Sequence, residues 1–171
     1  MTKTVLVCAA LAAGAFSPAP AQVLSPPAET SVAIGGKKIE VKYSAPSMRG
    51  RKIFGGLVPF GQVWRAGANA ATALHTEADL DLGGLKVPKG DYTLYVLPEA
   101  GQWMLIVNKQ TGQHGMTYTQ EMDLGRAKMT LAKSAAPVET YKMTLSATGA
   151  ADGKLQLEWE NTVATVSFSV K

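Results

Sequence analysis

Apolar and polar residues alternate along most of the chain, which is the pattern of β-strands with one buried face. The stretch KKIEVKY places Ile39, Val41 and Tyr43 on one side and charged residues on the other. The preceding SVAI and the pair Gly35-Gly36 predict that this strand is the second arm of a hairpin. Further apolar rows with a period of two are formed by Leu80 and Leu82, by Tyr141, Met143 and Leu145, by Leu155, Leu157 and Trp159, and by Val166, Phe168 and Val170.

Two segments are apolar on both faces. They are YTLYVLP, residues 92–98, and WMLIVN, residues 103–108, and the turn sequence EAGQ joins them. Together they predict a central hairpin that is covered on both sides. Turn residues separate the successive rows at spacings of about ten residues, with about nine strands, no long helix and no internal repeat. This pattern predicts an all-β fold, an antiparallel β-sandwich, with a partly closed barrel as the alternative.

Two longer segments, 44–71 and 109–125, interrupt the alternation. Irregular segments of this length are uncommon in compact domains and are disproportionately functional. The first segment is rich in large apolar residues between glycines and prolines. Such residues need to be covered, so we expect an ordered loop that folds over one end of the sandwich. Trp64, Phe54 and Phe60 are then expected to fill that end of the core.

The amino terminus has the layout of a secretory signal peptide. Lys3 is followed by an uncharged, largely apolar run and then by the small residues Ala19 and Ala21, which predicts a signal over residues 1–21 with cleavage near Ala21. The apolar run is shorter than the roughly 20 residues that a membrane span needs. We therefore expect an exported protein, periplasmic or extracellular, with an extended leader over residues 22–30 and a single β-sandwich domain over residues 31–171.

Composition and charge exclude several classes of function. The one cysteine, Cys8, lies within the predicted signal, so no disulfide, thiolate nucleophile or sulfur ligand is expected in the mature chain. Removal of the signal takes away Lys3 and leaves 16 basic and 13 acidic residues, a formal net charge of +3. No dense basic run is present, and no later segment is long and apolar enough to span a bilayer. We therefore expect neither nucleic-acid binding nor a stable membrane span.

The chain resembles a secreted bacterial family catalogued as domain of unknown function 2911. The resemblance rests on YSAPSMRGRKIFGGLVPFGQVWRAGANAAT, which begins at Tyr43, and on the later stretches VPKGDYTLYVLP, WMLIVNK and LEWENTVATVSFSV. It covers nearly all of the mature chain. One departure is His114, where the family often has tryptophan before a glycine. The resemblance implies a secreted or periplasmic β-rich domain and no particular chemistry.

Metal or cofactor binding is not predicted. His75 and His114 are far apart in sequence, and neither belongs to a short-spaced ligand motif. A site assembled in space with Asp79, Asp81 or Asp123 is the alternative, because carboxylates and imidazoles suit several divalent ions. The expected interpretation is that both histidines lie on the surface.

Catalytic use of serines or carboxylates has little local support. Ser44 and Ser47 flank Pro46 and are typical of a turn, without a nucleophile elbow. Glu158 and Glu160 are two residues apart on one strand, which places their Cα atoms about 7 Å apart on one face. That separation suits acid–base hydrolysis of a glycosidic bond, but it equally suits a solvated strand face.

The irregular segment 44–71 carries the candidate ligand-binding residues. These are the cations and the aromatic and amide side chains of this region: Arg49, Arg51, Trp64, Arg65 and Asn69. Guanidinium groups offer paired donors to carboxylates and phosphates, and a tryptophan ring offers a stacking face. The structural alternative is that Arg65 pairs with Glu158 or Glu160 and that Asn69 satisfies buried backbone groups of the loop.

Three functions remain open from sequence. The leading hypothesis is a non-catalytic binding module that holds a small polar or anionic ligand, or an extended segment of a partner, under the loop. The second is an envelope-associated hydrolase with Glu158, Glu160, Asp79 or His75 as acid–base groups. The third is a structural envelope component that associates through exposed strand edges. The sequence predicts no oligomeric state.

Overall fold

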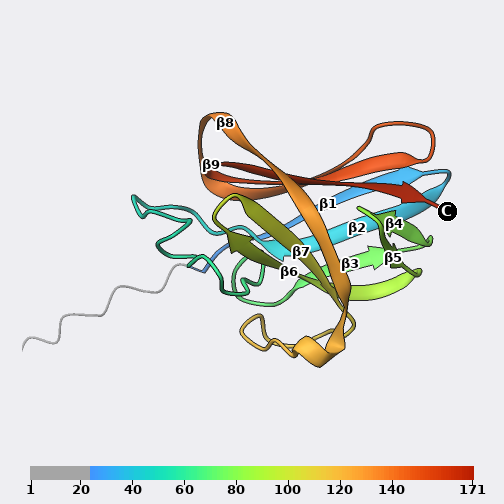
Figure 1. The fold of residues 1–171 in the computed structure, drawn as a ribbon, viewed down its shortest axis with the longest axis horizontal. Helices are drawn as coiled ribbons and strands as arrows, with labels where there is room; N and C mark the ends of the chain where they lie inside the picture. The colour runs from blue at the N-terminus through green and yellow to red at the C-terminus, as the bar shows by residue number, and fades with distance from the viewer. Residues whose placement is uncertain (1–23) are drawn as a thin grey trace, which may run out of the picture.

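The computed structural model describes residues 24–171, so the predicted signal peptide and the first two residues of the leader lie outside the described part. Within it, nine antiparallel strands form one continuous sheet in the order β1-β2-β3-β6-β7-β8-β9-β4-β5 (Figure 1). A short 3₁₀ turn, η1 (Gln120–Met122), precedes β8. The strands are β1 (Pro27–Ile34), β2 (Lys37–Ser44), β3 (Thr72–Thr76), β4 (Leu80–Leu82), β5 (Leu85–Val87), β6 (Gly90–Glu99), β7 (Gln102–Asn108), β8 (Asp123–Ala147) and β9 (Asp152–Val170).

The first hairpin forms where the sequence predicts it. Gly35 and Gly36 have φ of 57° and 73°, the left-handed conformation that a two-residue hairpin turn requires. The structure differs from the extended leader expected over residues 22–30, because β1 already begins at Pro27 and pairs along its whole length with β2. Proline is tolerated at the start of an edge strand, where no ladder donor is needed. The side chain of Thr30 accepts a hydrogen bond from the backbone of Leu145 and ties β1 to β8.

The long hairpin β8–β9 turns the single sheet into two layers. Residues 123–129 of β8 pair with β7, and residues 130–147 pair with β9, with register shifts between Lys133 and Lys142. The opposing strand bends at Glu160, which has a φ of 54°. The two strands therefore bend together and cross over the layer that contains β6 and β7 (Figure 1). The predicted antiparallel β-sandwich of about nine strands is confirmed.

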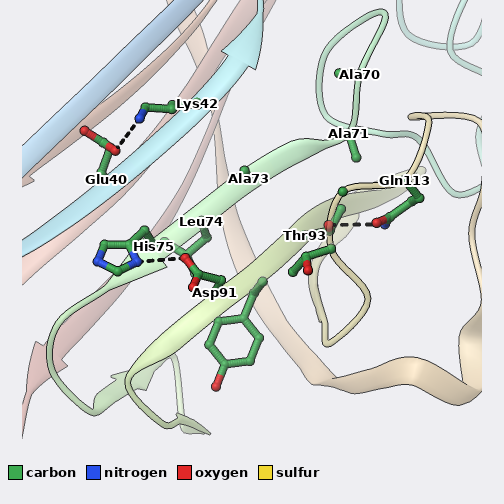
Figure 2. A pocket seen from close by; sticks show the side chains of 13 residues that line it. Glu40, Lys42, Ala70, Ala71, Ala73, Leu74, His75, Asp91, Thr93 and Gln113 are labelled. Carbon is green, nitrogen blue, oxygen red and sulfur yellow. Dashed lines mark hydrogen bonds and ion pairs between the residues drawn. The ribbon is translucent and has the colours of Figure 1, made fainter.

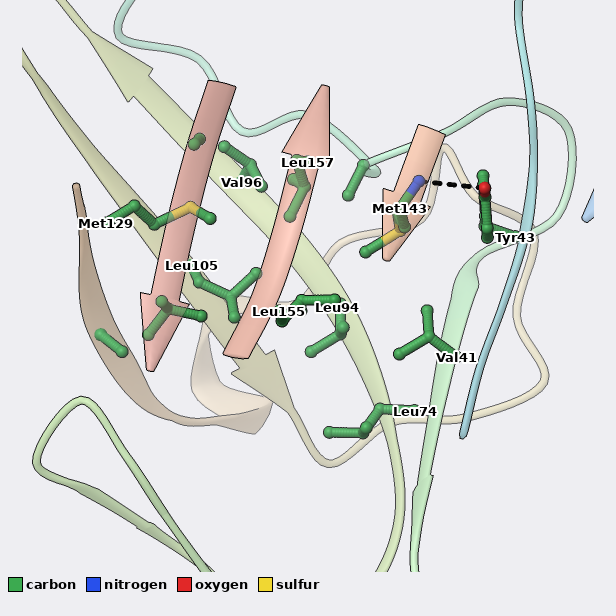
Figure 3. Packing of buried hydrophobic residues seen from close by; sticks show 14 of the residues in the cluster. Val41, Tyr43, Leu74, Leu94, Val96, Leu105, Met129, Met143, Leu155 and Leu157 are labelled. Carbon is green, nitrogen blue, oxygen red and sulfur yellow. Dashed lines mark hydrogen bonds between the residues drawn. The ribbon is translucent and has the colours of Figure 1, made fainter. Parts of the chain in front are cut away.

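The core lies between these two layers. Leu94 of β6 and Leu105 of β7 face Leu155 and Leu157 of β9 in one packed cluster (Figure 3). Both faces of the predicted central hairpin are covered, since Tyr95 and Ile106 are also buried. The irregular segment predicted over residues 109–125 is shorter in the structure, because β8 already starts at Asp123.

The segment between β2 and β3 forms the ordered loop that was predicted at one end of the sandwich. Ile53 and Val58 are buried, and Phe54 is 7% exposed. The backbones of Trp64 and Val96 of β6 exchange two hydrogen bonds, of 2.7 and 2.8 Å, so the loop is joined directly to the sheet. The expectation for Phe60 is wrong, because its ring is 47% exposed and lies outside the core.

The carboxylate of Glu160 holds the same loop from the opposite layer. It accepts hydrogen bonds from the backbone amides of Ile53, at 3.5 Å, and Phe54, at 3.3 Å. Buried amides of a loop need such acceptors, because an unpaired donor away from water is costly. The loop is thus fixed by β6 on one side and by β9 on the other. None of the helical turns in the described residues is long and apolar enough to cross a membrane.

Candidate functional site

The five residues selected from sequence line one cavity of about 320 Å³ under the loop. We call it the loop cavity. Residues 44–71 supply most of its wall, and the start of the described chain and Trp159 of β9 close it. Its described lining residues are Leu24, Ser25, Pro46, Ser47, Arg49, Arg51, Leu57, Val58, Trp64, Arg65, Gly67, Ala68, Asn69 and Trp159. The loop therefore folds so that polar side chains from its two ends surround one cavity.

Trp64 is both part of the core and part of the cavity wall. Its ring stacks on that of Trp159, with centroids 5.8 Å apart and planes 22° apart, and meets the ring of Tyr141 edge-on at 5.1 Å. Burial raises the pKa of the Tyr141 phenol well above its ordinary value, so this ring stays neutral. The remaining surface of the half-buried Trp64 lines the loop cavity. A ligand there would meet an indole held rigidly by two other rings.

Arg65 does not form the ion pair that the structural alternative expects. Glu160 binds loop amides, and Glu158 lies 3.9 Å from Lys142 instead. The guanidinium of Arg65 contacts the sulfur of Met116. Its Nε atom is buried and has no hydrogen-bond partner among the described residues. Arg65 therefore has one buried donor that the described part of the protein does not use.

The other candidate donors are partly used inside the protein. Arg51 donates from Nε to the carbonyl of Met48 at 2.9 Å and from Nη2 to the carbonyl of Ser47 at 2.8 Å. The side-chain amide of Asn69 donates to the carbonyl of Ser25 at 3.0 Å. The Asn69 contact differs from the structural alternative, because its acceptor Ser25 belongs to the chain that leads into β1 and not to the loop.

Arg49 is placed by its backbone. It has a left-handed φ of 50°, and its amide donates to the carboxylate of Glu139 at 2.9 Å. The side chain lines the loop cavity together with the two other arginines. A left-handed residue other than glycine costs conformational energy, so the surrounding contacts determine this geometry.

A second, smaller cavity of about 200 Å³ adjoins the first. We call it the methionine cavity. It shares Leu57, Val58, Trp64 and Arg65 with the loop cavity, and its other described lining residues are Pro59, Gln62, Val63, Tyr95, Gly115, Met116 and Tyr118. Sequence reasoning missed Met116, although it marked the segment 109–125 as irregular.

Segment 109–122 is held against the sheet by a polar network. The buried amide of Asn108 donates to the carbonyl of Thr119 at 2.9 Å and to the carboxylate of Asp123 at 2.8 Å. The hydroxyl of Tyr118 donates to the same carboxylate at 2.8 Å, and Arg126 forms an ion pair with it. Burial, followed by the hydrogen bond to Asp123, raises the pKa of Tyr118 to about 12. This network holds the segment that carries Met116 in place beside β7.

Comparison with known families decides the assignment that the sequence motifs suggest. The family described as "Protein of unknown function (DUF2911)" matches residues 25–168, which include the loop and all described lining residues of the two cavities except Leu24. The chain belongs to the DUF2911 family. No curated protein matches the chain. No solved structure matches it either.

The DUF2911 domain has a further hollow, of about 580 Å³, on the outer face of β2, β3 and β6 (Figure 2). There the Nδ1 of His75 lies 2.7 Å from the carboxylate of Asp91. The carboxylate of Glu40, on the neighbouring strand, binds Lys38 and Lys42, and these hydrogen bonds lower its pKa to about 2. Both members of the His75–Asp91 pair are well exposed, at 44% and 71% of their side chains.

The acid–base groups considered from sequence engage different partners in this DUF2911 domain. Asp79 accepts a hydrogen bond from the amide of Lys89, and Asp81 pairs with Lys86. The ring of His114, which is remote in sequence from His75, accepts a hydrogen bond from the backbone amide of Met116. No group of three or more histidines, cysteines and carboxylates in residues 24–171 is arranged to hold a metal ion. The two glutamates of β9 have different partners, since Glu160 accepts from a loop amide and Glu158 lies near Lys142.

Proposed function

We propose that this DUF2911 protein is an exported, non-catalytic binding module that holds a small anionic ligand in the loop cavity. The single observation that carries the proposal is the charge of the cavity wall. Three arginines line it, and no aspartate or glutamate is among its described lining residues. Guanidinium groups facing a partly enclosed space favour carboxylates, phosphates and sulfates.

The role of each residue follows from its contacts. Arg65 would supply the principal hydrogen bonds through its terminal guanidinium nitrogens, because it lines both cavities and its guanidinium contacts a thioether sulfur, which is a weak acceptor. Trp64 would supply a fixed apolar surface, since Trp159 and Tyr141 hold its ring. Arg51 would add positive charge from a position fixed by two backbone carbonyls. A small, pre-formed cavity with a few directed polar groups is typical of ligand sites.

Binding is favoured over hydrolysis by the positions of the carboxylates. Glu160 fixes the loop, Glu158 lies near Lys142, and Asp79 binds a backbone amide. Hydrolysis of a glycosidic bond uses two carboxyl groups that flank the bond, and here these groups engage different parts of the fold. Export follows the amino-terminal sequence pattern, and it would expose the cavity to ligands of the periplasm or the medium.

The test is a binding titration of the mature chain, residues 22–171, with acetate, succinate, benzoate, phosphate and sulfate. Arg65→Gln removes the proposed anion contact, and Lys37→Gln removes the same charge from an exposed site beside the first hairpin turn. We expect at least one anion to bind the wild type and Lys37→Gln, and to bind Arg65→Gln about tenfold or more weakly. Equal binding by both variants, or no binding of any anion, would refute the proposal.

A further inference from the structure

The two cavities that meet at Arg65 differ in chemical character. The loop cavity has three arginines, Ser47 and Asn69 in its wall. The methionine cavity is lined mainly by apolar side chains, including Pro59, Val63 and Met116. Leu57, Val58, Trp64 and Arg65 belong to both walls. A cationic space and an apolar space therefore adjoin along one shared boundary.

The hydroxyl groups in the methionine cavity are already used within the protein. Tyr95 donates to the carbonyl of Thr117 at 2.6 Å, and Tyr118 donates to Asp123. Arg65 and Gln62 are then the polar side chains that remain in its described wall. A ligand group that enters this cavity gains little by being polar and gains by being apolar.

The rim of the two cavities keeps apolar side chains in water. Leu57 is 48% exposed and Met116 is 73% exposed. The sulfur of Met116 lies against the guanidinium of Arg65, so apolar and cationic surfaces are adjacent at this point. Exposed apolar groups grouped beside a cavity mark binding surfaces, whereas scattered ones carry no such meaning.

We infer that the ligand of this site is an amphiphilic anion, a carboxylate with an unbranched apolar chain. This inference rests on the proposed function and specifies its ligand class. The carboxylate binds Arg65 at the boundary, and the chain lies in the methionine cavity between Leu57 and Met116. No acidic side chain is among the described lining residues of either cavity, so the head group meets no repulsion from the walls. Cavities of about 320 and 200 Å³ suit a free small molecule.

The experiment measures how affinity changes with chain length. Butanoate, hexanoate and octanoate, each below its micelle concentration, are titrated into the mature chain. Complete burial of a methylene contributes about 0.8 kcal/mol, which is about fourfold in affinity, and half burial gives about twofold. We therefore expect an increase of about two- to fourfold for each added methylene. The gain per methylene is the readout, because it is independent of the strength of the head-group contact.

Met116→Gln and Met122→Gln form a matched pair of variants. Met122 is 37% exposed in the turn η1 and is not among the described lining residues of either cavity. We expect Met116→Gln to lose most of the gain per methylene and Met122→Gln to keep it. A gain that survives in Met116→Gln would overturn the inference, because the chain would then lie elsewhere.

Failure of the inference is distinguishable from failure of the proposed function. Anion binding that depends on Arg65 but does not increase with chain length would overturn the amphiphile and leave the anion site standing. Binding of phosphate or sulfate alone would have the same consequence. If no anion of either series binds, both proposals fail.

Discussion

Replacement of Phe54 by alanine tests whether the loop is an integral part of the core. The Phe54 ring is 7% exposed and contacts all three tryptophans, with ring centroids 4.5 Å from Trp103, 6.1 Å from Trp64 and 6.2 Å from Trp159. Truncation of a buried phenylalanine to alanine costs about 3–5 kcal/mol, because apolar burial is lost and a cavity remains. Native domains are stable by about 5–15 kcal/mol, so the variant should lose a large part of its stability.

Phe60→Ala is the matched control, since it makes the same change in the same loop at a ring that is 47% exposed. We expect it to cost about 1 kcal/mol or less. Urea unfolding followed by tryptophan fluorescence is the assay, because all three tryptophans of the chain lie around Phe54. On heating, Phe54→Ala should lower the melting temperature by about 6–20 °C. Equal losses for Phe54→Ala and Phe60→Ala would refute the packed loop.

Three further predictions concern single polar side chains. Glu160→Gln should destabilise by about 1–3 kcal/mol, because an NH2 group replaces one carboxylate oxygen, so one of the two loop amides loses its acceptor. Glu158→Gln should destabilise by at most about 0.5 kcal/mol, and urea unfolding of the two variants measures the difference. The pKa of Glu40 is about 2 in the folded protein against an ordinary value of 4.5. Its contribution to stability is therefore complete above pH 4.5 and is lost as the pH falls to about 2. The stability difference between the wild type and Glu40→Gln, measured by urea unfolding, should vanish over this pH range. The pKa of Tyr118 is raised from 10.0 to about 12, so the stability that this phenol contributes is lost as the pH rises between these values. Tyr118→Phe should remove this pH-dependent loss of stability when unfolding is measured at alkaline pH.

The strands with regular alternation could be predicted because burial of one face requires that pattern. β8 could not be predicted over its full length. Its first part carries short side chains at buried positions, such as Ala127, and its middle bends where the register shifts. The start of β1 was also missed, because Pro27 and its neighbours have no apolar row and their pairing with β2 depends on the tertiary fold.

The composition of the loop could identify the residues that share a cavity but could not show how each donor is used. The contacts of Arg51 and Asn69 with backbone carbonyls depend on the path of the loop, which local sequence does not determine. Phe54 and Phe60 have equal hydrophobicity, yet one is buried and the other exposed. Met116 reaches Arg65 only through the fold, since the two residues are 51 positions apart in the sequence.

The signature tryptophan contributes to the fold, whereas the neighbouring arginine contributes chiefly to the proposed binding site. The backbone of Trp64 is bonded to β6 and its ring is stacked on Trp159, so any change there alters both stability and the cavity wall. The stem of Arg65 passes close to Gly115, where an added Cβ would lie 2.5 Å from the Cδ of Arg65. This close packing would pre-organise the guanidinium and lower the entropic cost of the proposed binding. Because the guanidinium of Arg65 contacts only a thioether sulfur among the hydrogen bonds described above, Arg65 is the position where we expect a substitution to remove the proposed ligand binding and leave the fold in place.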